Sequence, residues 1–117
     1  KVAEAIAYNK NDRHILIVEN NGAIANMQDD AMVEVVCELG INGPRPMRVG
    51  NIPQFNLGLL VNQVSCEKLI VDAYFENSYQ KALEAFTLNR LINDAKKARK
   101  VLDALIEANK GMWPELR

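Results

Sequence analysis

Alternating hydrophobic and polar positions, which are typical of strands, mark two segments in the first third of the chain. Residues 14–19, HILIVE, form a β-branched apolar run with turn residues on both sides, which predicts a buried strand. Residues 32–39, MVEVVCEL, place Val33, Val35 and Cys37 on one face and predict a second strand. The two segments therefore indicate the start of a small sheet.

A third, shorter strand is expected around residues 47–49. The turn sequence GINGP at 40–44 ends the second strand, and neither Pro44 nor Pro46 can donate a hydrogen bond to a neighbouring strand. The third strand is therefore predicted at an edge of the sheet.

The remaining apolar positions recur at steps of three and four residues, which is the period of an amphipathic helix. Helices are predicted over residues 1–9, 53–77, 79–88 and 94–109. Pro53 suits the first helical position, Ser78 suits an N-cap, and Gly111 suits a C-terminal cap.

The predicted order of elements is a helix end, two or three strands, and then three helices. Strands grouped before helices, without β–α–β alternation, favour an α+β fold with a small antiparallel sheet packed against helices. At 117 residues the chain has the size of one domain. Its start, KVAEAIAY, shows neither an initiator Met nor an N-cap residue, and we therefore expect a piece of a longer polypeptide.

Composition and charge narrow the class of protein. The 14 Lys plus Arg residues nearly balance 15 Asp plus Glu, which excludes nucleic-acid binding by bulk electrostatics. No stretch approaches the ~20 consecutive apolar residues of a membrane-spanning helix. A hydrophobic content of 49% with 25% charged residues is typical of a globular domain with neither nucleic acid nor membrane as partner.

Two cysteines, Cys37 and Cys66, stand apart in apolar neighbourhoods and without a CxxC spacing. This pattern is typical of small core residues in a reducing compartment, so we expect a cytoplasmic location. A disulfide between the two cysteines is the alternative.

The inventory of catalytic side chains is thin. His14 is the only histidine, and its place at the start of an apolar strand favours a hydrogen-bonded structural role over acid–base chemistry. Asp29 and Asp30 either hold a cation or solvate a turn, and no three metal ligands occur at suitable spacing. The six glycines form neither a GxGxxG motif nor a P-loop.

Two further groups each have two interpretations. The cluster from Lys96 to Lys100 suggests a phosphate or nucleic-acid patch, but its spacing follows the outer face of an amphipathic helix and favours a solvated face. Met112 and Trp113 are expected to fold back onto the core after the last helix. A partner-binding tail is the alternative for these two residues.

The polar loop that begins at Asn20, Asn21 and Gly22 lies between two predicted strands. Side-chain amides at strand ends suit the binding of sugar hydroxyls or phosphate oxygens. Because Asn and Gly are also the usual turn formers, a loop that satisfies its own backbone is an equally good interpretation. Asn20 and Asn21 are the candidate substrate-binding residues of the chain.

Three stretches carry a resemblance to a known family: IVENNGAIANMQDDAMVEVVC, NGPRPMRVGNIPQF and the terminal EANKGMWPEL. Together they resemble the C-terminal region of glycoside hydrolase family 4, over essentially the whole chain. Within that family the chain looks most like the 6-phospho-α-glucosidases, on the evidence of NIPQF and the WPEL ending. The 6-phospho-β-glucosidases share the central pattern and are the alternative.

The resemblance implies an NAD- and manganese-dependent hydrolase of 6-phosphorylated disaccharides such as maltose 6′-phosphate. In that family NAD transiently oxidises the hydroxyl at the third sugar carbon, a base removes the neighbouring proton, the aglycone is eliminated and water adds. The implied fold resembles lactate and malate dehydrogenases, with a Rossmann domain followed by an α+β domain. The resemblance also implies a homo-oligomer, a dimer or tetramer.

Carried over residue by residue, the resemblance leaves the family's catalytic machinery outside residues 1–117. The NAD motif, the metal-binding Cys and His and the catalytic Tyr and Asp are expected upstream, so this segment should hold no catalytic, cofactor-binding or metal residue. Cys37 and His14 match no metal ligand, and only Asn20 and Asn21 have a place near the pocket. We therefore expect the chain alone to be inactive.

Two other hypotheses stay open from the sequence. The chain also suits the second domain of a malate- or lactate-type dehydrogenase, which lacks the upstream metal-binding Cys and His. From a different class, it suits a non-enzymatic interaction module whose long apolar helix binds a partner protein.

Overall fold

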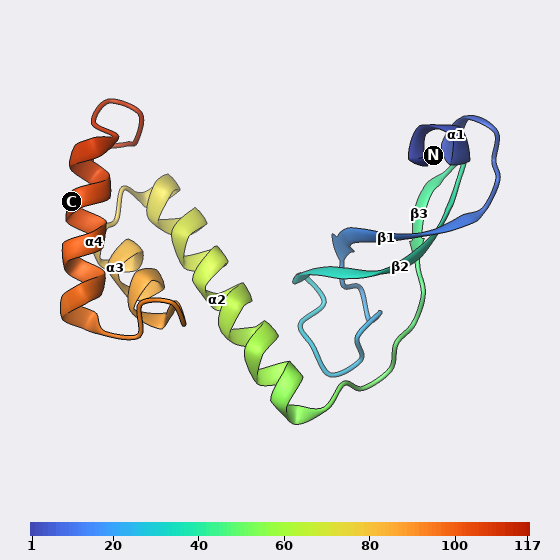
Figure 1. The fold of residues 1–117 in the computed structure, drawn as a ribbon, viewed down its shortest axis with the longest axis horizontal. Coiled ribbons are helices and arrows are strands. Elements are labelled where there is room, and N and C mark those ends of the chain that lie inside the picture. The colour runs from blue at the N-terminus through green and yellow to red at the C-terminus, as the bar shows by residue number, and fades with distance from the viewer. The chain divides into compact units, whose positions relative to one another are not determined.

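The computed structural model describes residues 1–117, in four helices and three strands (Figure 1). In chain order these are α1 (Val2–Ala7), β1 (Asp12–Glu19), β2 (Met32–Gly40), β3 (Gly43–Pro46), α2 (Gln54–Glu76), α3 (Tyr79–Leu88) and α4 (Ala95–Ala108). The chain forms two compact units, residues 1–58 and residues 59–117, and α2 runs through the boundary. The predicted α+β class and the antiparallel sheet are confirmed.

Residues 1–58 contain a three-stranded sheet of order β1-β2-β3, antiparallel throughout. β1 pairs with β2 from Asp12, opposite Leu39, to Glu19, opposite Met32. Side chains along β2 alternate between exposed and buried, and the three residues predicted to share one face are all buried. The period of two in the sequence thus assigns the faces of this strand correctly.

The third strand lies a few residues before its predicted place. The sequence predicts it at 47–49, whereas β3 follows β2 through a tight turn in which Gly40 lies opposite Gly43. Gly43 has a φ of +88°, a left-handed conformation that other residues resist, and this allows the chain to reverse at once. Pro44 and Pro46 are accommodated because β3 is an edge strand, as predicted.

Other parts of residues 1–58 add buried apolar side chains to those of the sheet. α1 contacts β2, and Ala5 of α1 is fully buried. The loop between β1 and β2 buries Ala23, Ile24, Met27 and Ala31. On the other face of the sheet Ile15 and Ile17 are 66% and 68% exposed. One face of this small sheet therefore has a core, and the other presents apolar side chains to solvent.

Residues 59–117 form a helical unit in which α3 packs against α4. Its central residues come from all three helices and are Ala73, Ala82 and Leu102. Larger, partly buried side chains surround them: Tyr79, Leu83, Phe86, Ile106 and Leu116. The two alanines at the centre let the helices approach closely, while larger side chains fill the space around them.

The predicted N-cap of α3 and the predicted C-terminal cap of α4 are present, and α4 also has an N-cap that was not predicted. The Ser78 side chain accepts a hydrogen bond from the backbone N–H of Lys81 at 3.3 Å, and Asp94 accepts one from Lys97 at 2.7 Å. Each bond satisfies an N–H group of the first helical turn that has no partner within the helix. Gly111 follows α4 with a φ of +83°, as a C-terminal cap requires.

α2 begins and ends within one residue of its predicted limits, but it buries little. Only Val64, Cys66 and Ala73 are buried, whereas Phe55 and Phe75 are about three-quarters exposed. Apolar side chains lie on several sides of this helix, which is typical of a helix that other parts of a protein cover. None of the helices combines the length and apolar character that crossing a bilayer requires.

Candidate functional site

The loop between β1 and β2, residues 20–31, is the candidate site of the sequence, and it is internally bonded. At its base the Asn20 N–H donates to the Ala31 carbonyl at 2.8 Å, and the Asn21 N–H donates to the Asp29 carbonyl at 2.9 Å. The first bond continues the β1–β2 register, and the second joins the two sides of the loop. The loop is therefore a defined structural element on the sheet.

Asn20 holds this loop from the inside. Its side chain is fully buried, and its amide NH₂ group donates to the carbonyls of Ile24, Met27 and Gln28 at 3.0, 3.2 and 3.1 Å. The amide oxygen accepts a hydrogen bond from the Ile24 N–H at 2.7 Å. Because these bonds occupy both hydrogens and the oxygen of the amide, Asn20 shapes the loop. A direct contact between Asn20 and a ligand stays a prediction.

A second amide, which the sequence did not single out, joins the loop to the segment before α2. Asn26 donates from Nδ2 to the Ile52 carbonyl and accepts at Oδ1 from the Ile52 N–H, both at 3.0 Å. Beside it, the Val49 N–H donates to the Ala23 carbonyl at 2.7 Å. The Asn26 side chain thus makes the same pair of hydrogen bonds with Ile52 that a backbone amide group makes in a sheet. The sequence around Asn26 does not indicate this contact, because Ile52 lies 26 residues further along the chain.

The solvent side of the loop is polar and acidic. Asn21 is exposed with a φ of +41°, and its Nδ2 donates to the Glu19 carboxylate at 3.2 Å. Asp29 and Asp30 are exposed as well, and residues 14–44 contain no Lys or Arg. Sugar hydroxyls find hydrogen-bond donors and acceptors on such a surface. The loop therefore offers polar groups that suit a sugar.

The other chemistry-bearing residues of this unit lie on the sheet. His14 is opposite Cys37 in the β1–β2 pair, and its Nε2 atom is buried without a hydrogen-bond partner. The expected hydrogen bond of His14 is therefore absent at that atom.

Both cysteines are free thiols and buried, so the alternative of a disulfide is excluded. Burial raises the pKa of the Cys37 thiol, and burial is also the main cause of the raised pKa of Cys66. A thiol with a raised pKa stays protonated at neutral pH and is a poor nucleophile or metal ligand. Neither cysteine is a candidate for catalysis.

The acidic side chains of this structure do not form a metal site. No group of three or more His, Cys, Asp or Glu side chains gathers at one place, so the pair Asp29 and Asp30 lacks the further ligands of a metal site. The charged residues from Lys96 to Lys100 are exposed on α4, as expected for a solvated helix face.

Trp113 and Met112, which follow α4, differ in how much of each side chain is exposed. Trp113 is 40% exposed and borders an apolar hollow on α4, so its predicted return to the core is partly right. Met112 is 84% exposed, and the same prediction is wrong for it. Met112 belongs to the turn that closes α4, where its N–H donates to the Asn109 carbonyl at 2.9 Å.

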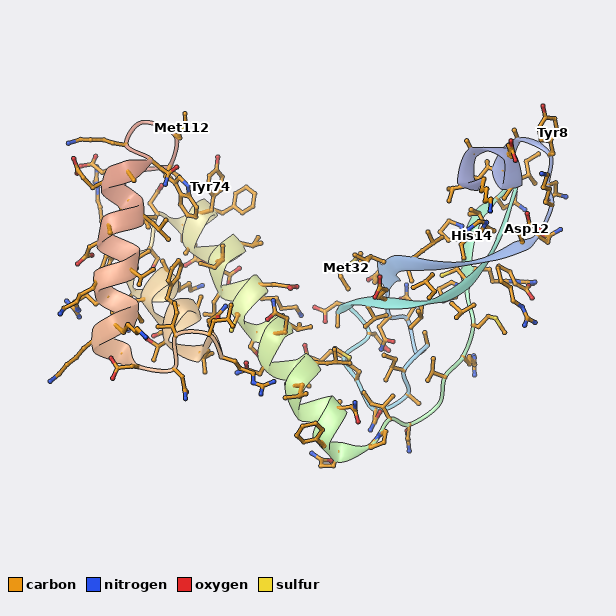
Figure 2. All side chains as sticks on the ribbon, in the orientation of Figure 1. Tyr8, Asp12, His14, Met32, Tyr74 and Met112 are labelled. Atoms are coloured by element: carbon orange, nitrogen blue, oxygen red, sulfur yellow. The ribbon has the colours of Figure 1, made fainter.

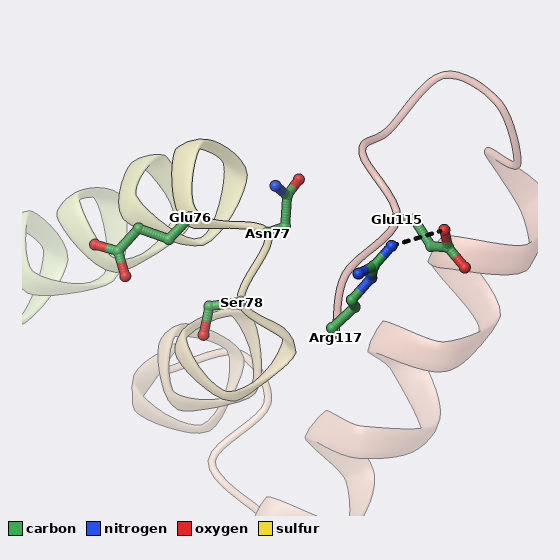
Figure 3. Close-up of a pocket in the computed structure, with 5 residues that line it drawn as sticks. All are labelled: Glu76, Asn77, Ser78, Glu115 and Arg117. Atoms are coloured by element: carbon green, nitrogen blue, oxygen red, sulfur yellow. Dashed lines mark ion pairs between the residues drawn. The ribbon is translucent and has the colours of Figure 1, made fainter.

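A polar hollow of about 590 Å³ lies where α2 meets α3, next to the C-terminal residues (Figure 3). Its lining residues are Glu76, Asn77, Ser78, Glu115 and Arg117. The Arg117 N–H donates to the Asn77 carbonyl at 2.8 Å, which pairs the end of the chain with the α2–α3 turn. The side chains of Arg117 and Glu115 form an exposed ion pair at 3.8 Å, so the hollow has the character of a solvated surface.

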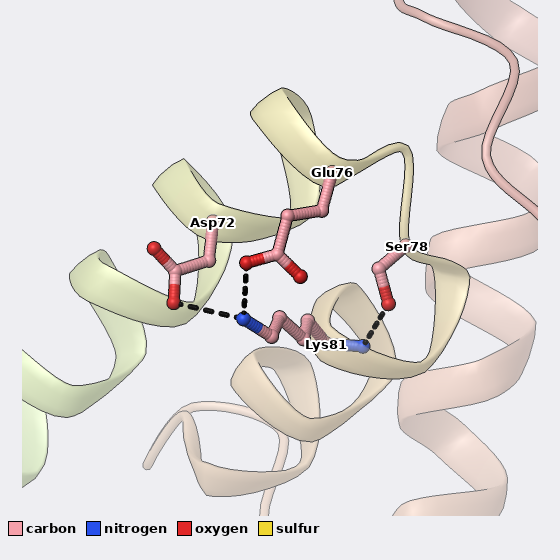
Figure 4. A network of polar contacts seen from close by, with 4 residues as sticks. All are labelled: Asp72, Glu76, Ser78 and Lys81. Carbon is pink, nitrogen blue, oxygen red and sulfur yellow. Dashed lines mark hydrogen bonds and ion pairs between the residues drawn. The ribbon is translucent and has the colours of Figure 1, made fainter.

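Ion pairs and hydrogen bonds connect the helices around this turn. Lys81 Nζ lies 2.6 Å from the Glu76 carboxylate and 3.1 Å from that of Asp72 (Figure 4), and these hydrogen bonds raise the pKa of Lys81. The Tyr79 hydroxyl donates to Asp103 at 2.7 Å, and this bond is the main cause of the raised pKa of Tyr79. Both contacts join helices and are structural.

Comparison with known sequences places most of the chain in one family. A family model described as "Family 4 glycosyl hydrolase C-terminal domain" matches residues 1–92. The maltose-6′-phosphate glucosidase of Bacillus subtilis is 56% identical over 115 residues, which are 98% of this chain and 26% of that protein. A probable 6-phospho-beta-glucosidase of the same organism is 37% identical over 111 residues, 95% of this chain and 25% of that protein.

Comparison with solved structures indicates the same family. The crystal structure of a 6-phospho-alpha-glucosidase from gut microorganisms, in complex with NAD and Mn²⁺, matches with a TM-score of 0.97 and 84% identity. The match covers 99% of this chain and 27% of the crystallised one. The chain thus spans about a quarter of the length of the proteins it resembles.

Proposed function

The chain belongs to the family 4 glycosyl hydrolases, as a C-terminal domain, and on that premise we propose that it is the C-terminal part of an NAD- and metal-dependent 6-phospho-alpha-glucosidase. The observation that carries this proposal is the 84% identity, at a TM-score of 0.97, to an enzyme of that name. The proposed substrates are 6-phosphorylated disaccharides such as maltose 6′-phosphate. The fall in identity from 56% to 37% between an alpha- and a beta-type relative supports the alpha assignment.

The residues of this chain do not fit NAD or a catalytic metal. Three metal ligands do not meet at any point, and the sequence has no glycine-rich phosphate loop. We place both groups, and the catalytic residues, in the rest of the polypeptide, which makes up about three quarters of a relative's length. Residues 1–117 are then one C-terminal domain, inactive by itself.

The 20–31 loop is the part of this domain that we assign to the sugar. Asn21 presents an exposed amide on the acidic rim of the loop, while buried Asn20 and the Asn26–Ile52 pair hold the loop in place. A rigid loop loses little conformational entropy when it binds a ligand. Asn21 is therefore proposed to contact a sugar hydroxyl, and Asn20 to position it.

Location and assembly are also part of the proposal. The two free, buried thiols support a cytoplasmic location, because disulfides are rare in that reducing compartment. Exposed apolar side chains on α2 support contacts with further protein, including other copies of the enzyme.

The direct test is an assay of the full-length protein with chromogenic 6-phospho-α- and 6-phospho-β-glucosides, in the presence of NAD and Mn²⁺. We expect turnover of the α-glucoside by the full-length protein and none by residues 1–117 alone. Preference for the β-glucoside would contradict the alpha assignment. Turnover by the 117-residue chain would contradict the placement of the catalytic residues.

A further inference from the structure

Two Asn-Gly pairs of residues 1–58 can undergo a chemical modification that the proposed catalysis does not use. They are Asn21-Gly22, in the 20–31 loop, and Asn42-Gly43, in the turn between β2 and β3. The loop ends at Met32, and the turn lies next to the start of β1 at Asp12. Figure 2 shows these two residues at opposite ends of the β1–β2 pair, so each Asn-Gly pair has its own surroundings.

An Asn-Gly pair can lose its side-chain amide without an enzyme. The backbone nitrogen of the glycine attacks Cγ of the asparagine, and a new C–N bond forms. Solvent carries the proton of the glycine N–H to the side-chain nitrogen, whose C–N bond breaks with release of ammonia. Water then opens the five-membered imide at either carbonyl and leaves Asp or isoaspartate. Glycine favours the attack because it has no side chain to obstruct it.

Exposure and crowding do not distinguish the two pairs. Both asparagines are exposed and both glycines are half-buried. Gly22 has a φ of +78° and Gly43 a φ of +88°, and a Cβ atom added at either would meet nothing within 4 Å. Every other asparagine of the chain precedes a residue with a side chain. The state of the attacking nitrogen is therefore the difference to examine.

The backbone nitrogen of Gly22 is available. Residues 20–23 form a turn that is closed by a hydrogen bond from the Ala23 N–H to the Asn20 carbonyl at 2.7 Å. The two central residues, Asn21 and Gly22, have φ values of +41° and +78°, as in a type I′ turn. The closing bond of such a turn does not use the third N–H, and the Gly22 N–H donates to no acceptor of the protein. This nitrogen is therefore free to lose its proton and attack.

The backbone nitrogen of Gly43 is held in the sheet. Pro44 and Pro46 have no N–H, so they occupy the non-hydrogen-bonded positions of the β2–β3 ladder. Because the two kinds of position alternate, Gly43 and its partner Gly40 form a hydrogen-bonded pair, in which the Gly43 N–H donates to the Gly40 carbonyl. The Met47 N–H, which donates to β2 at 2.9 Å, follows the same alternation. Attack by the Gly43 nitrogen thus requires the end of the ladder to open.

The side-chain contacts of the two asparagines matter less. Asn21 Nδ2 donates to the Glu19 carboxylate at 3.2 Å, and because both side chains are exposed, water can replace this bond. The Asn42 side chain makes no hydrogen bond. A bond between two strands is lost only when the strands separate locally, which is a larger opening than the rotation of one exposed side chain. The nitrogen therefore outweighs the side chain in setting the relative rates.

We propose that Asn21 is a site of spontaneous deamidation in the folded protein, and that it reacts before Asn42 because the Gly22 nitrogen is free and the Gly43 nitrogen is bonded in the sheet. The product places a carboxylate beside Glu19, where an amide donated a hydrogen bond, so two like charges then face each other. Deamidation thus alters the loop that is assigned to the sugar. That consequence rests on the proposed function, whereas the choice between the two pairs does not.

The test incubates the folded full-length protein in a mildly alkaline buffer and follows both pairs by peptide mass spectrometry, which detects the gain of about 1 Da. We expect Asn21 to convert at least about ten times faster than Asn42. A smaller ratio, or no conversion of Asn21, would overturn the proposal. In guanidinium chloride the two rates should agree within about threefold, because the unfolded chain lacks the bonds that distinguish them. A preference of the same size in denaturant would assign it to local sequence and would also overturn the proposal.

Variants show whether the Gly22 nitrogen is the attacking group. Gly22→Ala should slow the conversion of Asn21 at least about tenfold, because a Cβ atom obstructs the attack. Gly43→Ala is the matched control, since it introduces an alanine at a similar positive φ, and it should leave the rate at Asn21 unchanged. Asn21→Gln keeps both glycines and should abolish the mass gain at this pair. An unchanged rate in Gly22→Ala would mean direct hydrolysis of the amide and would contradict the proposed route.

A ligand separates this proposal from the proposed function. Under that function, glucose 6-phosphate added with NAD and Mn²⁺ should slow the conversion of Asn21 in the full-length protein and leave Asn42 unaffected. An unchanged rate at Asn21 would contradict only its assignment to the sugar. A rate ratio below tenfold without ligand would contradict only the deamidation site.

Discussion

All five non-glycine residues with a positive φ in this chain are asparagines, and each lies outside the helices and strands. They are Asn9, Asn11, Asn21, Asn77 and Asn93. Asn tolerates the left-handed conformation better than most residues because its short polar side chain bonds to nearby backbone. At the residue scale, asparagine therefore forms turns through its backbone, while Asn20 and Asn26 fix a loop through their side chains.

Replacing Asn20 by Ala should destabilise the protein by about 3 kcal/mol. The substitution leaves the Ile24 N–H and three carbonyls without their partner in a buried site, and each unsatisfied buried group is costly. Urea unfolding followed by circular dichroism measures the loss. Asn21→Gly, which keeps the left-handed backbone at an exposed site, should cost less than about 1 kcal/mol. Equal stability of the two variants would contradict the structural role of Asn20.

Asn21→Gly in the full-length enzyme should raise the KM for a 6-phospho-α-glucoside by about 3- to 10-fold, which corresponds to one lost hydrogen bond. The glycine keeps the backbone and removes only the amide. Asn42→Gly, in the exposed β2–β3 turn, is the control and should leave the KM unchanged. An unaltered KM in Asn21→Gly would remove Asn21 from the proposed substrate site.

Most boundaries of helices and strands follow from the local sequence. Ser78 acts as the N-cap that the sequence predicts, and α2 ends within a residue of its predicted limit. β3 is the element that differs, because proline and glycine patterns indicate an edge strand without fixing which residues face β2. At the scale of elements, local signals define helices well and strand pairing less well.

Two glycine substitutions should change stability in opposite directions. A Cβ atom at Gly40 would lie 2.7 Å from the side-chain oxygens of both Asn9 and Asn11, so Gly40→Ala should cost about 1–2 kcal/mol. A Cβ atom at Gly58, inside α2, meets nothing within 4 Å, so Gly58→Ala should gain about 1 kcal/mol of helix propensity. Thermal unfolding of the 117-residue chain compares them, and a stabilising Gly40→Ala would contradict the close approach at the β2–β3 turn.

The contact between α3 and α4 should weaken at alkaline pH. The hydrogen bond to Asp103 raises the pKa of Tyr79 above its ordinary value of about 10. A raised pKa means that the stabilisation is complete below pH ~10 and is lost as the pH rises through the pKa of the folded state. The Tm difference between the unmodified chain and Tyr79→Phe should therefore shrink above pH ~10. A difference that stays constant while the pH rises through the pKa of Tyr79, measured in the folded chain by its absorbance, would contradict the contribution of this bond.

At the scale of the molecule, the chain has two units with small cores and several exposed apolar surfaces. Sheet residues Ile15 and Ile17, and Phe75 at the end of α2, present more apolar area than an independent domain needs. These surfaces agree with a chain that spans about a quarter of its relatives' length. Under the proposed function, the rest of the enzyme covers part of these surfaces.

The effect of ligands on the Tm should differ between this chain and the full-length protein. NAD and Mn²⁺ should raise the Tm of the full-length protein, because a ligand that binds only the folded state stabilises it, and removal of the metal by a chelator should lower that Tm. The Tm of residues 1–117 alone should respond to neither, since this chain gathers no metal-ligand cluster. A rise in the Tm of the isolated chain with Mn²⁺ would place a metal site within it.

Sequence alone determined the elements of this protein whose cause is local. Helices and strands follow from the period of apolar side chains, caps follow from single residues beside those periods, and the family follows from contiguous motifs such as NNGAI. The tertiary structure decided which of two adjacent amides is buried and which is exposed, paired Asn26 with Ile52, and left Met112 in solvent. Those outcomes depend on residues that are distant in the sequence and compete for the same buried space and the same hydrogen bonds. The local period of apolar side chains therefore cannot predict them.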